Sequence, residues 1–189
     1  ARVAGQGDLA TAEALLRQAI PSARNPKLRT IAEYELGRLL FEPPTNRTRK
    51  QEGLQLLTQA AVSYPAAQSK LGKVYAEGEG VRKDLNRSVS YYRRAAAGGS
   101  AGAQIELATL LRQNPSLGTT QEIANLAAQG IAQLRGESRK GNANSSRRLG
   151  QIYQDGVIVP KNRAESEKYL SLAVQQGQEG ARCGTAVVG

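Results

Sequence analysis

Apolar residues recur along the chain in two short motifs, each with the spacing of a helix. The first motif is a Leu, a small residue, one polar residue and two further apolar residues. It is found at residues 36–40, 71–75, 107–111 and 149–153. The second is an apolar pair followed after two residues by Ala, found at residues 15–19, 56–60, 91–95 and 169–173. Because residues three and four apart share one helix face, each motif predicts an amphipathic helix.

The two motifs keep in step along the chain, so the predicted helices come in pairs. A single pair cannot bury both of its apolar faces, whereas stacked pairs share one continuous core. We therefore expect an all-α fold, a right-handed superhelical solenoid of antiparallel helix pairs. The expected helices lie near residues 8–20, 27–41, 47–62, 66–77, 85–97, 101–113, 119–139, 143–154 and 162–176.

Proline and glycine positions agree with this map. All seven prolines fall outside the expected helix interiors, where each would cost about 3 kcal/mol. Gly98, Gly99, Gly141 and Gly177 stand where second helices of pairs should end. The expected helix at 119–139 is interrupted by two glycines, Gly130 and Gly136.

We expect a single repeat solenoid over residues 1–189. Its units lie near residues 1–21 (partial), 27–62, 66–99, 102–140 and 143–177, with 178–189 as the truncated start of a further unit or a tail. Residues 1–5 are interpreted as the tail of a helix that would pair with 8–20. Since repeat arrays need polar caps, the natural protein is expected to be longer, or its ends to be covered by a partner.

Composition and charge exclude several classes of function. The net charge is +10, and the segments 1–64, 65–118 and 119–189 carry +3, +4 and +3, so the charge is spread evenly. Such a surface attracts acidic partners, but 4% aromatic residues are too few for a base-stacking platform, and we expect no nucleic acid. No segment reaches the roughly 18 apolar residues of a membrane span.

Catalytic chemistry has little support in the sequence. The chain has no His, so His-dependent triads and zinc sites are excluded. Cys183 is the single cysteine and is interpreted as a bystander thiol. We expect no enzyme activity, no catalytic residue, no metal and no cofactor. The tyrosines at 75, 91 and 92 are interpreted as core residues, and Gly78 and Gly80 as turn glycines.

One unit carries the pattern of a known repeat at many positions. They are Ala67, Leu71, Gly72, Tyr75, Gly78, Gly80, Val81, Asp84, Ala95, Ala96 and Gly99. The unit at 145–177 keeps part of the pattern, with Asn162 in place of Asp84 and Val157-Ile158 in place of the second loop glycine. These units resemble the Sel-one-like repeat, a relative of the tetratricopeptide repeat. The resemblance implies a protein–protein interaction scaffold.

A narrower resemblance points to a compartment and a process. The opening segment 5–13, the degenerate units and the segment 63–67 resemble the periplasmic scaffold lipoproteins of bacterial alginate secretion. This implies a periplasmic, outer-membrane-anchored component of an exopolysaccharide export complex. Its partners would be an outer-membrane porin or a polymer-modifying protein, together with an acidic polysaccharide. A lipid anchor would lie outside this chain.

Two other functions stay open at this stage. One is a periplasmic repeat regulator that binds and represses a sensor kinase. The other is a luminal adaptor of the endoplasmic reticulum, because Asn46, Asn86 and Asn144 fit the glycosylation acceptor pattern.

The candidate binding residues come from the first helices of the pairs, next to the buried Leu of each motif. In solenoids of this type the first helices line the concave surface, where extended partners dock. The candidates are Arg38, Lys70, Lys73, Arg148 and Gln151. The alternative is that these side chains belong to an ordinary solvated surface.

Overall fold

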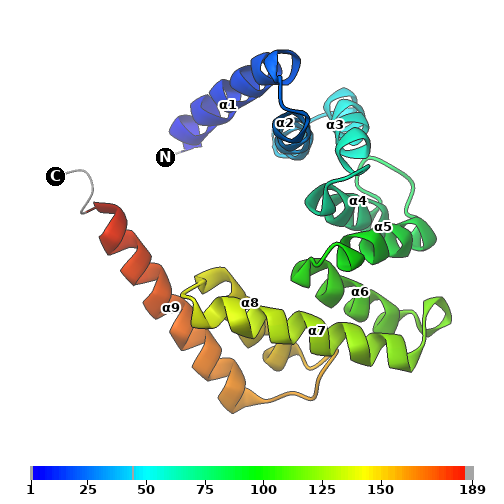
Figure 1. The fold of residues 1–189 in the computed structure, drawn as a ribbon, viewed down its shortest axis with the longest axis vertical. Coiled ribbons are helices and arrows are strands. Elements are labelled where there is room, and N and C mark those ends of the chain that lie inside the picture. Colours follow the sequence, from blue (N-terminus) through cyan, green and yellow to red (C-terminus); the bar gives the residue numbers. More distant parts are fainter. Residues whose placement is uncertain (1, 44, 186–189) are drawn as a thin grey trace. The chain divides into compact units, whose positions relative to one another are not determined.

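The computed structural model describes the backbone of residues 2–43 and 45–185, and the side chains of residues 8–43 and 45–178. Over these residues every regular element is helical (Figure 1). The chain divides into two compact units, Ala1–Ser100 and Ala101–Gly189. The predicted all-α fold class is therefore confirmed.

Apart from the first helix of the chain, the helices of each unit pack in antiparallel pairs. Unit 1 contains α1 (Arg2–Ser22), α2 (Pro26–Leu39), α3 (Arg47–Ala60), α4 (Pro65–Glu77) and α5 (Leu85–Ala97). Unit 2 contains α6 (Ala101–Gln113), a short 3-10 turn (Pro115–Leu117), α7 (Thr120–Arg139), α8 (Ala143–Asp155) and α9 (Arg163–Thr185). The pairs are α2 with α3, α4 with α5, α6 with α7 and α8 with α9 (Figure 1).

Several helices begin where a polar side chain caps the first turn. Asn25, Asn46, Asp84, Thr119 and Asn142 accept hydrogen bonds from backbone N–H groups of the helices that follow them. Asn162 does the same for α9 through the N–H of Glu165 at 3.0 Å. Each such cap is worth about 1 kcal/mol, so the helix starts are determined locally by the sequence.

Three expectations about the helix ends are wrong. Pro21 lies inside α1, in its last turn, where the missing N–H removes only the single bond to the Arg17 carbonyl. The Ser22 hydroxyl adds a bond in the same turn by donating to Gln18 O at 2.8 Å. The segment 2–5 continues α1 and is not a separate helix. The helix expected to end at 176 runs through Gly177 to Thr185. Gly177 does not adopt the positive φ with which glycine often ends a helix, so the helix continues past it.

The predicted helix at 119–139 is confirmed, and one of its glycines has a packing role. A Cβ at Gly130 would lie 2.7 Å from the side chain of Ile105 on α6, so the glycine lets the paired helices approach closely. Gly136 has no such neighbour.

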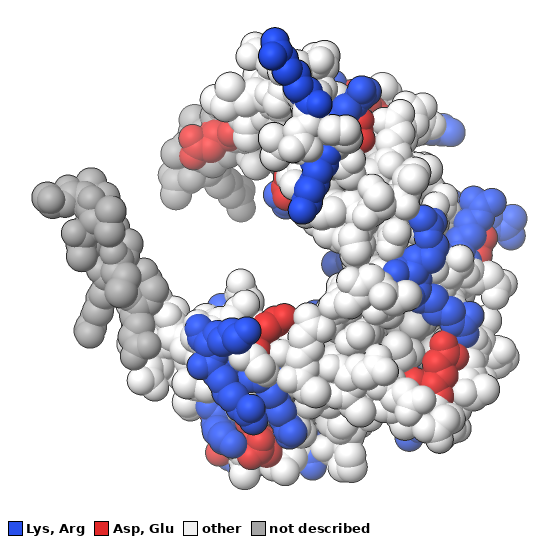
Figure 2. Space-filling view, in the orientation of Figure 1, with Lys and Arg blue, Asp and Glu red and all other residues white. Residues whose placement is uncertain are grey.

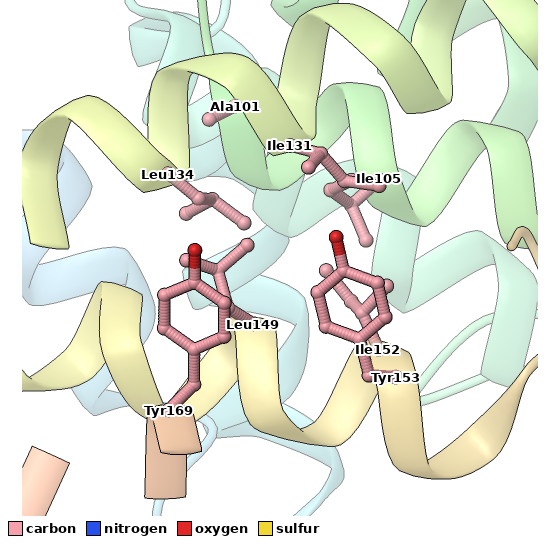
Figure 3. Packing of buried hydrophobic residues seen from close by; sticks show 8 residues of the cluster. All are labelled: Ala101, Ile105, Ile131, Leu134, Leu149, Ile152, Tyr153 and Tyr169. Carbon is pink, nitrogen blue, oxygen red and sulfur yellow. The ribbon is translucent and has the colours of Figure 1, made fainter. Parts of the chain in front are cut away.

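The core of each unit combines residues of the two motifs with other apolar residues of the same helices and their ends. In unit 1 the buried cluster is Phe41, Leu57, Ala60, Ala61, Ala67, Leu71 and Val74. In unit 2 the cluster draws on all four helices and contains Ala101, Ile105, Ile131, Leu134, Leu149, Ile152, Tyr153 and Tyr169 (Figure 3). Tyr92 is 4% exposed, whereas Tyr75 and Tyr91 are half-buried and pack against the unit 1 cluster.

The helix pairs α4–α5 and α8–α9 are held together by the same contacts. The hydroxyl of Ser88 donates to the carbonyl of Gly72 at 2.7 Å, and that of Ser166 donates to the carbonyl of Gly150 at 2.9 Å. Gly72 lies against the ring of Tyr92, and Gly150 lies against Leu170. These equivalent contacts show that residues 71–92 and 149–170 are two copies of one structural unit.

In unit 1 a network of four charged residues ties α1 to α3. Arg17 bonds Glu13 on its own helix and Glu52 on α3, while Arg49 on α3 bonds Glu13 at 2.9 Å. Burial tends to raise the pKa of Glu13, but the hydrogen bonds from Arg49 and Arg17 hold it below its ordinary value. The hydrogen bond from Arg17 likewise lowers the pKa of Glu52, against the effect of its partial burial.

We expect acid to loosen α1 before it unfolds the rest of unit 1. Because both carboxyl pKa values are lower in the folded protein, the network is stabilising above the ordinary value of 4.5 and loses its contribution as the pH falls further. The protection factors of the α1 amides, which correct for the pH dependence of intrinsic exchange, should therefore fall below pH 4.5 more than those of the α4 amides. A Glu13→Gln variant should show this loosening already at pH 7, and equal exchange in both proteins at pH 7 would contradict the prediction.

Candidate functional site

The five predicted binding residues lie on first helices, three of them in unit 1 and two in unit 2. Arg38 is on α2 and Lys70 and Lys73 are on α4, all in unit 1. Arg148 and Gln151 are on α8 in unit 2.

In unit 1 each of the three cations has a partner close by. Arg38 bonds Glu35 at 3.0 Å, and Lys73 lies 3.8 Å from Glu77, so both form ion pairs within their own helices. Lys70 lies over the ring of Phe41, 5.1 Å from its centroid, and 4.0 Å from a Glu79 carboxylate oxygen. Their role in binding a partner stays a prediction.

In unit 2, Arg148 and Gln151 line one pocket of about 200 Å³. We name it the α6–α8 pocket, because Ile105, Glu106 and Thr109 come from α6 and Arg148, Gln151, Ile152 and Asp155 from α8. The loop residues Val157 and Ile158 complete its wall. The isoleucine and valine side chains form the apolar part of the pocket wall, and the remaining lining residues are polar or charged.

An ion pair joins the two first helices across the α6–α8 pocket. The guanidinium of Arg148 bonds the carboxylate of Glu106, although the residues are far apart in sequence. Both side chains are partly exposed, so the pair alone adds at most about 1 kcal/mol to stability. Asp155 is exposed and forms no ion pair within the described part of the chain. The motif spacing pointed to Arg148 and Gln151, but nothing local pointed to Glu106 or Asp155.

A second, larger pocket of about 640 Å³ lies in unit 1 at the start of α5. We name it the basic loop pocket. It is lined by Leu54 of α3, Tyr75 of α4 and the segment 81–87. Arg82, Lys83 and Arg87 stand around it with one acidic residue, Asp84. Figure 2 shows basic side chains gathered over the region of α5.

Tyr75 forms one wall of the basic loop pocket, and its ring contacts a second aromatic ring and a cation. Tyr91 stacks on it with ring centroids 5.7 Å apart and an interplanar angle of 6°. The guanidinium of Arg87 lies over the ring at 5.5 Å from its centroid. The equivalent rings in unit 2, Tyr153 and Tyr169, stack in the same way at 6.1 Å.

The loop between α4 and α5 confirms the predicted role of its glycines. Gly78 and Gly80 have φ of 75° and 76°, a region that only glycine adopts readily. Glu79 between them points to two cations, Lys50 at 3.5 Å and Lys70 at 4.0 Å. The loop is thus a structural turn, and it places residues 81–87 in the wall of the basic loop pocket.

Among the described residues no group of His, Cys, Asp or Glu is arranged to hold a metal ion. The side chain of Cys183 lies outside the described residues. Within the described residues, no helix combines the length and apolar character needed to cross a lipid bilayer.

The geometry defines an all-helical solenoid of antiparallel pairs with pockets on its first helices and loops. The family model of the Sel1 repeat matches residues 30–61, 65–100 and 143–178, more than half of the chain. The chain belongs to the Sel1 repeat family. Proteins of this family generally mediate protein–protein interaction, and their scaffold is typically non-catalytic.

Solved structures show the same fold. A Sel1 repeat protein from Oxalobacter formigenes is 21% identical, with a TM-score of 0.57, and the match covers 93% of this chain and 70% of that one. The protein c5321, a protective antigen of uropathogenic Escherichia coli strains displaying an SLR fold, is 24% identical with a TM-score of 0.52. That match covers 87% of this chain but 33% of c5321. No curated protein sequence shows significant similarity to the chain.

Proposed function

We propose that this chain is a non-catalytic scaffold that docks partner proteins, and that it serves a periplasmic exopolysaccharide export complex at the outer membrane. The observation that carries the docking role is the α6–α8 pocket. It lies between the first helices of two neighbouring pairs, where repeat proteins present their extended binding surfaces.

The size and lining of the α6–α8 pocket favour a protein partner. Its volume of about 200 Å³ is below the range of roughly 300–1,000 Å³ usual for small-molecule sites. It therefore suits an apolar side chain projecting from a partner. The Glu106–Arg148 pair lies beside the apolar wall, and its charged groups would bind polar groups of the partner around the inserted side chain.

The process and the compartment rest on sequence resemblance and charge. The resemblance to scaffold lipoproteins of alginate secretion suggests an outer-membrane porin or a polymer-modifying protein as the partner. A net charge of +10 also favours proximity to an acidic polysaccharide.

Affinity capture from the envelope of an alginate-producing bacterium tests this proposal. Wild type is compared with Arg148→Glu, which breaks the ion pair, and with Gln151→Trp, an uncharged change that fills the pocket. We expect capture of an outer-membrane porin or polymer-modifying protein, identified by mass spectrometry, and about tenfold weaker capture by both variants. Circular dichroism must show that both variants keep the helical content of wild type.

Arg139→Glu is the matched control, because Arg139 is exposed in the same unit and the substitution changes the net charge equally. It should retain the partner. Equal loss in Arg148→Glu and Arg139→Glu would show that charge alone, and not the α6–α8 pocket, governs capture. Capture of a sensor kinase in place of export proteins would favour the regulatory alternative.

A further inference from the structure

The basic loop pocket carries more positive charge than its neighbours neutralise. Arg82 and Lys83 are exposed, and neither side chain forms an ion pair or hydrogen bond within the described part of the chain. Arg87 lies 3.3 Å from Asp84, the one carboxylate among the lining residues. One acidic group therefore faces three cations, and two of these cations are available to an anionic ligand.

The fold of the loop does not require these cations. The equivalent loop of unit 2 is built alike, since the N–H of Asn162 donates to Tyr153 O at 3.0 Å as that of Asp84 donates to Tyr75 O at 2.9 Å. Asp84 and Asn162 both cap the helix that follows.

The second copy nevertheless carries a weaker positive cluster. Pro160 stands at the position of Arg82 and Glu165 at the position of Arg87, whereas Lys161 keeps the position of Lys83 and Arg163 stands at the position of Leu85. Two copies of the same loop thus differ in the charge they present, although their backbone contacts agree. The basic cluster of unit 1 is free to serve a ligand.

The shape and lining of the pocket indicate which class of anion fits. The half-buried side chains of Leu54, Val81 and Leu85 lie beside the cations, so an apolar group can bind next to a carboxylate. The Tyr75 ring already stacks on Tyr91 and has the Arg87 guanidinium over it, so these contacts compete with the stacking of a sugar ring. A peptide that alternates acidic and apolar side chains meets both features, whereas an acidic polysaccharide meets only the charge.

We propose that the basic loop pocket binds an acidic, apolar-flanked segment of a partner protein. Carboxylates of that segment pair with Arg82 and Lys83, and a neighbouring apolar side chain packs on Leu54 and Leu85. This inference rests on the proposed scaffold function, but it concerns a surface in unit 1 and does not use the α6–α8 pocket.

Fluorescence anisotropy with a defined probe tests the proposal on the whole chain. The probe is a labelled peptide of alternating Glu and Leu, compared with the same peptide carrying Lys for Glu and with a labelled polyuronate oligosaccharide. We expect the acidic peptide to bind wild type, with affinity falling as salt rises because the charges are exposed. The double variant Arg82→Ala, Lys83→Ala should bind it roughly tenfold more weakly.

The matched control is Arg139→Ala, Lys140→Ala, which removes two exposed adjacent cations from unit 2. It should bind the acidic peptide as wild type does. Equal weakening in the two double variants would overturn the proposal, because net charge alone would then explain binding. Binding of the oligosaccharide but not of the acidic peptide would overturn it as well, in favour of a polysaccharide ligand.

Failure of this inference is distinguishable from failure of the scaffold function. If wild type does not bind the acidic peptide, only the proposed role of the basic loop pocket is overturned. Partner capture through Arg148 and Gln151 is measured in a separate experiment. If wild type binds the acidic peptide but captures no partner protein from the envelope extract, the proposed role of the α6–α8 pocket is overturned instead.

Discussion

Replacing Leu149 with Ala is expected to lower the free energy of unfolding of unit 2 by about 3 kcal/mol. Leu149 is 0% exposed and lies in the cluster that joins α6, α7, α8 and α9. Removing three carbons from this position loses the transfer free energy of the buried atoms and leaves a cavity. The surrounding helices can fill that cavity only in part, because Tyr153 and Tyr169 are held against each other by stacking.

The measurement is urea unfolding combined with hydrogen exchange of the α8 and α9 amides, which reports on unit 2 directly. Val174→Ala on α9 is the matched control, because Val174 is 62% exposed and its change should stay within about 0.5 kcal/mol. Leu149→Met keeps most of the volume and should cost less than about 1.5 kcal/mol. If Leu149→Ala were no more damaging than Val174→Ala, the unit 2 core described here would be wrong.

Replacing Gly150 with Ala is expected to destabilise unit 2 by about 2 kcal/mol, although Ala is the better helix former. A Cβ at this position would lie 2.6 Å from Leu170 Cγ and 3.2 Å from the Leu170 backbone N. The side chain of Leu170 would have to move, and the backbone of α9 would have to follow it. The buried hydrogen bond from Ser166 to the Gly150 carbonyl would be stretched by the same displacement.

A second glycine in the same unit provides a control of opposite sign. Gly136 also lies inside a helix, but a Cβ there would meet nothing within 4 Å. Gly136→Ala should therefore stabilise the protein by about 0.5–1 kcal/mol through helix propensity alone. Both free energies come from urea unfolding curves of the single variants.

A double-mutant cycle isolates the contact between the two helices. In a Leu170→Ala background, Gly150→Ala should cost less than it does in wild type, because the clashing side chain is gone. Equal costs in the two backgrounds would show that Gly150 is required for a reason other than the approach of Leu170.

The local properties of the chain were accessible from the sequence. Helix periodicity placed the buried leucines, including Leu71 and Leu149, because burial in a helix pair follows the 3.6-residue repeat. The glycines at 78 and 80 were recognised as turn residues because positive φ is a property of single residues. The helices predicted near 85–97 and 101–113 agree with α5 and α6, since caps and breakers act within a few residues.

Helix ends and charge partners were less accessible, because they depend on several interactions at once. Pro21 was expected to lie beyond a helix, yet the last turn of α1 tolerates it at the loss of one hydrogen bond. The end of α9 was placed too early at Gly177, because glycine disfavours a helix without forbidding it. Arg38 and Lys73 pair within their own helices at spacings of three and four residues, which the sequence itself offers, whereas the pairing of Arg148 with Glu106 depends on packing between helices.

By itself, the sequence determined that this protein is an array of amphipathic helix pairs, because burial of each apolar stripe is a local consequence of spacing. Only the tertiary structure decided which polar groups of different helices and loops meet. Arg148 reaches Glu106 because α6 and α8 lie beside each other, and Arg82, Lys83 and Arg87 surround one pocket because the α4–α5 loop folds back on α3. Such meetings depend on packing between segments far apart in the chain, which no short-range pattern encodes.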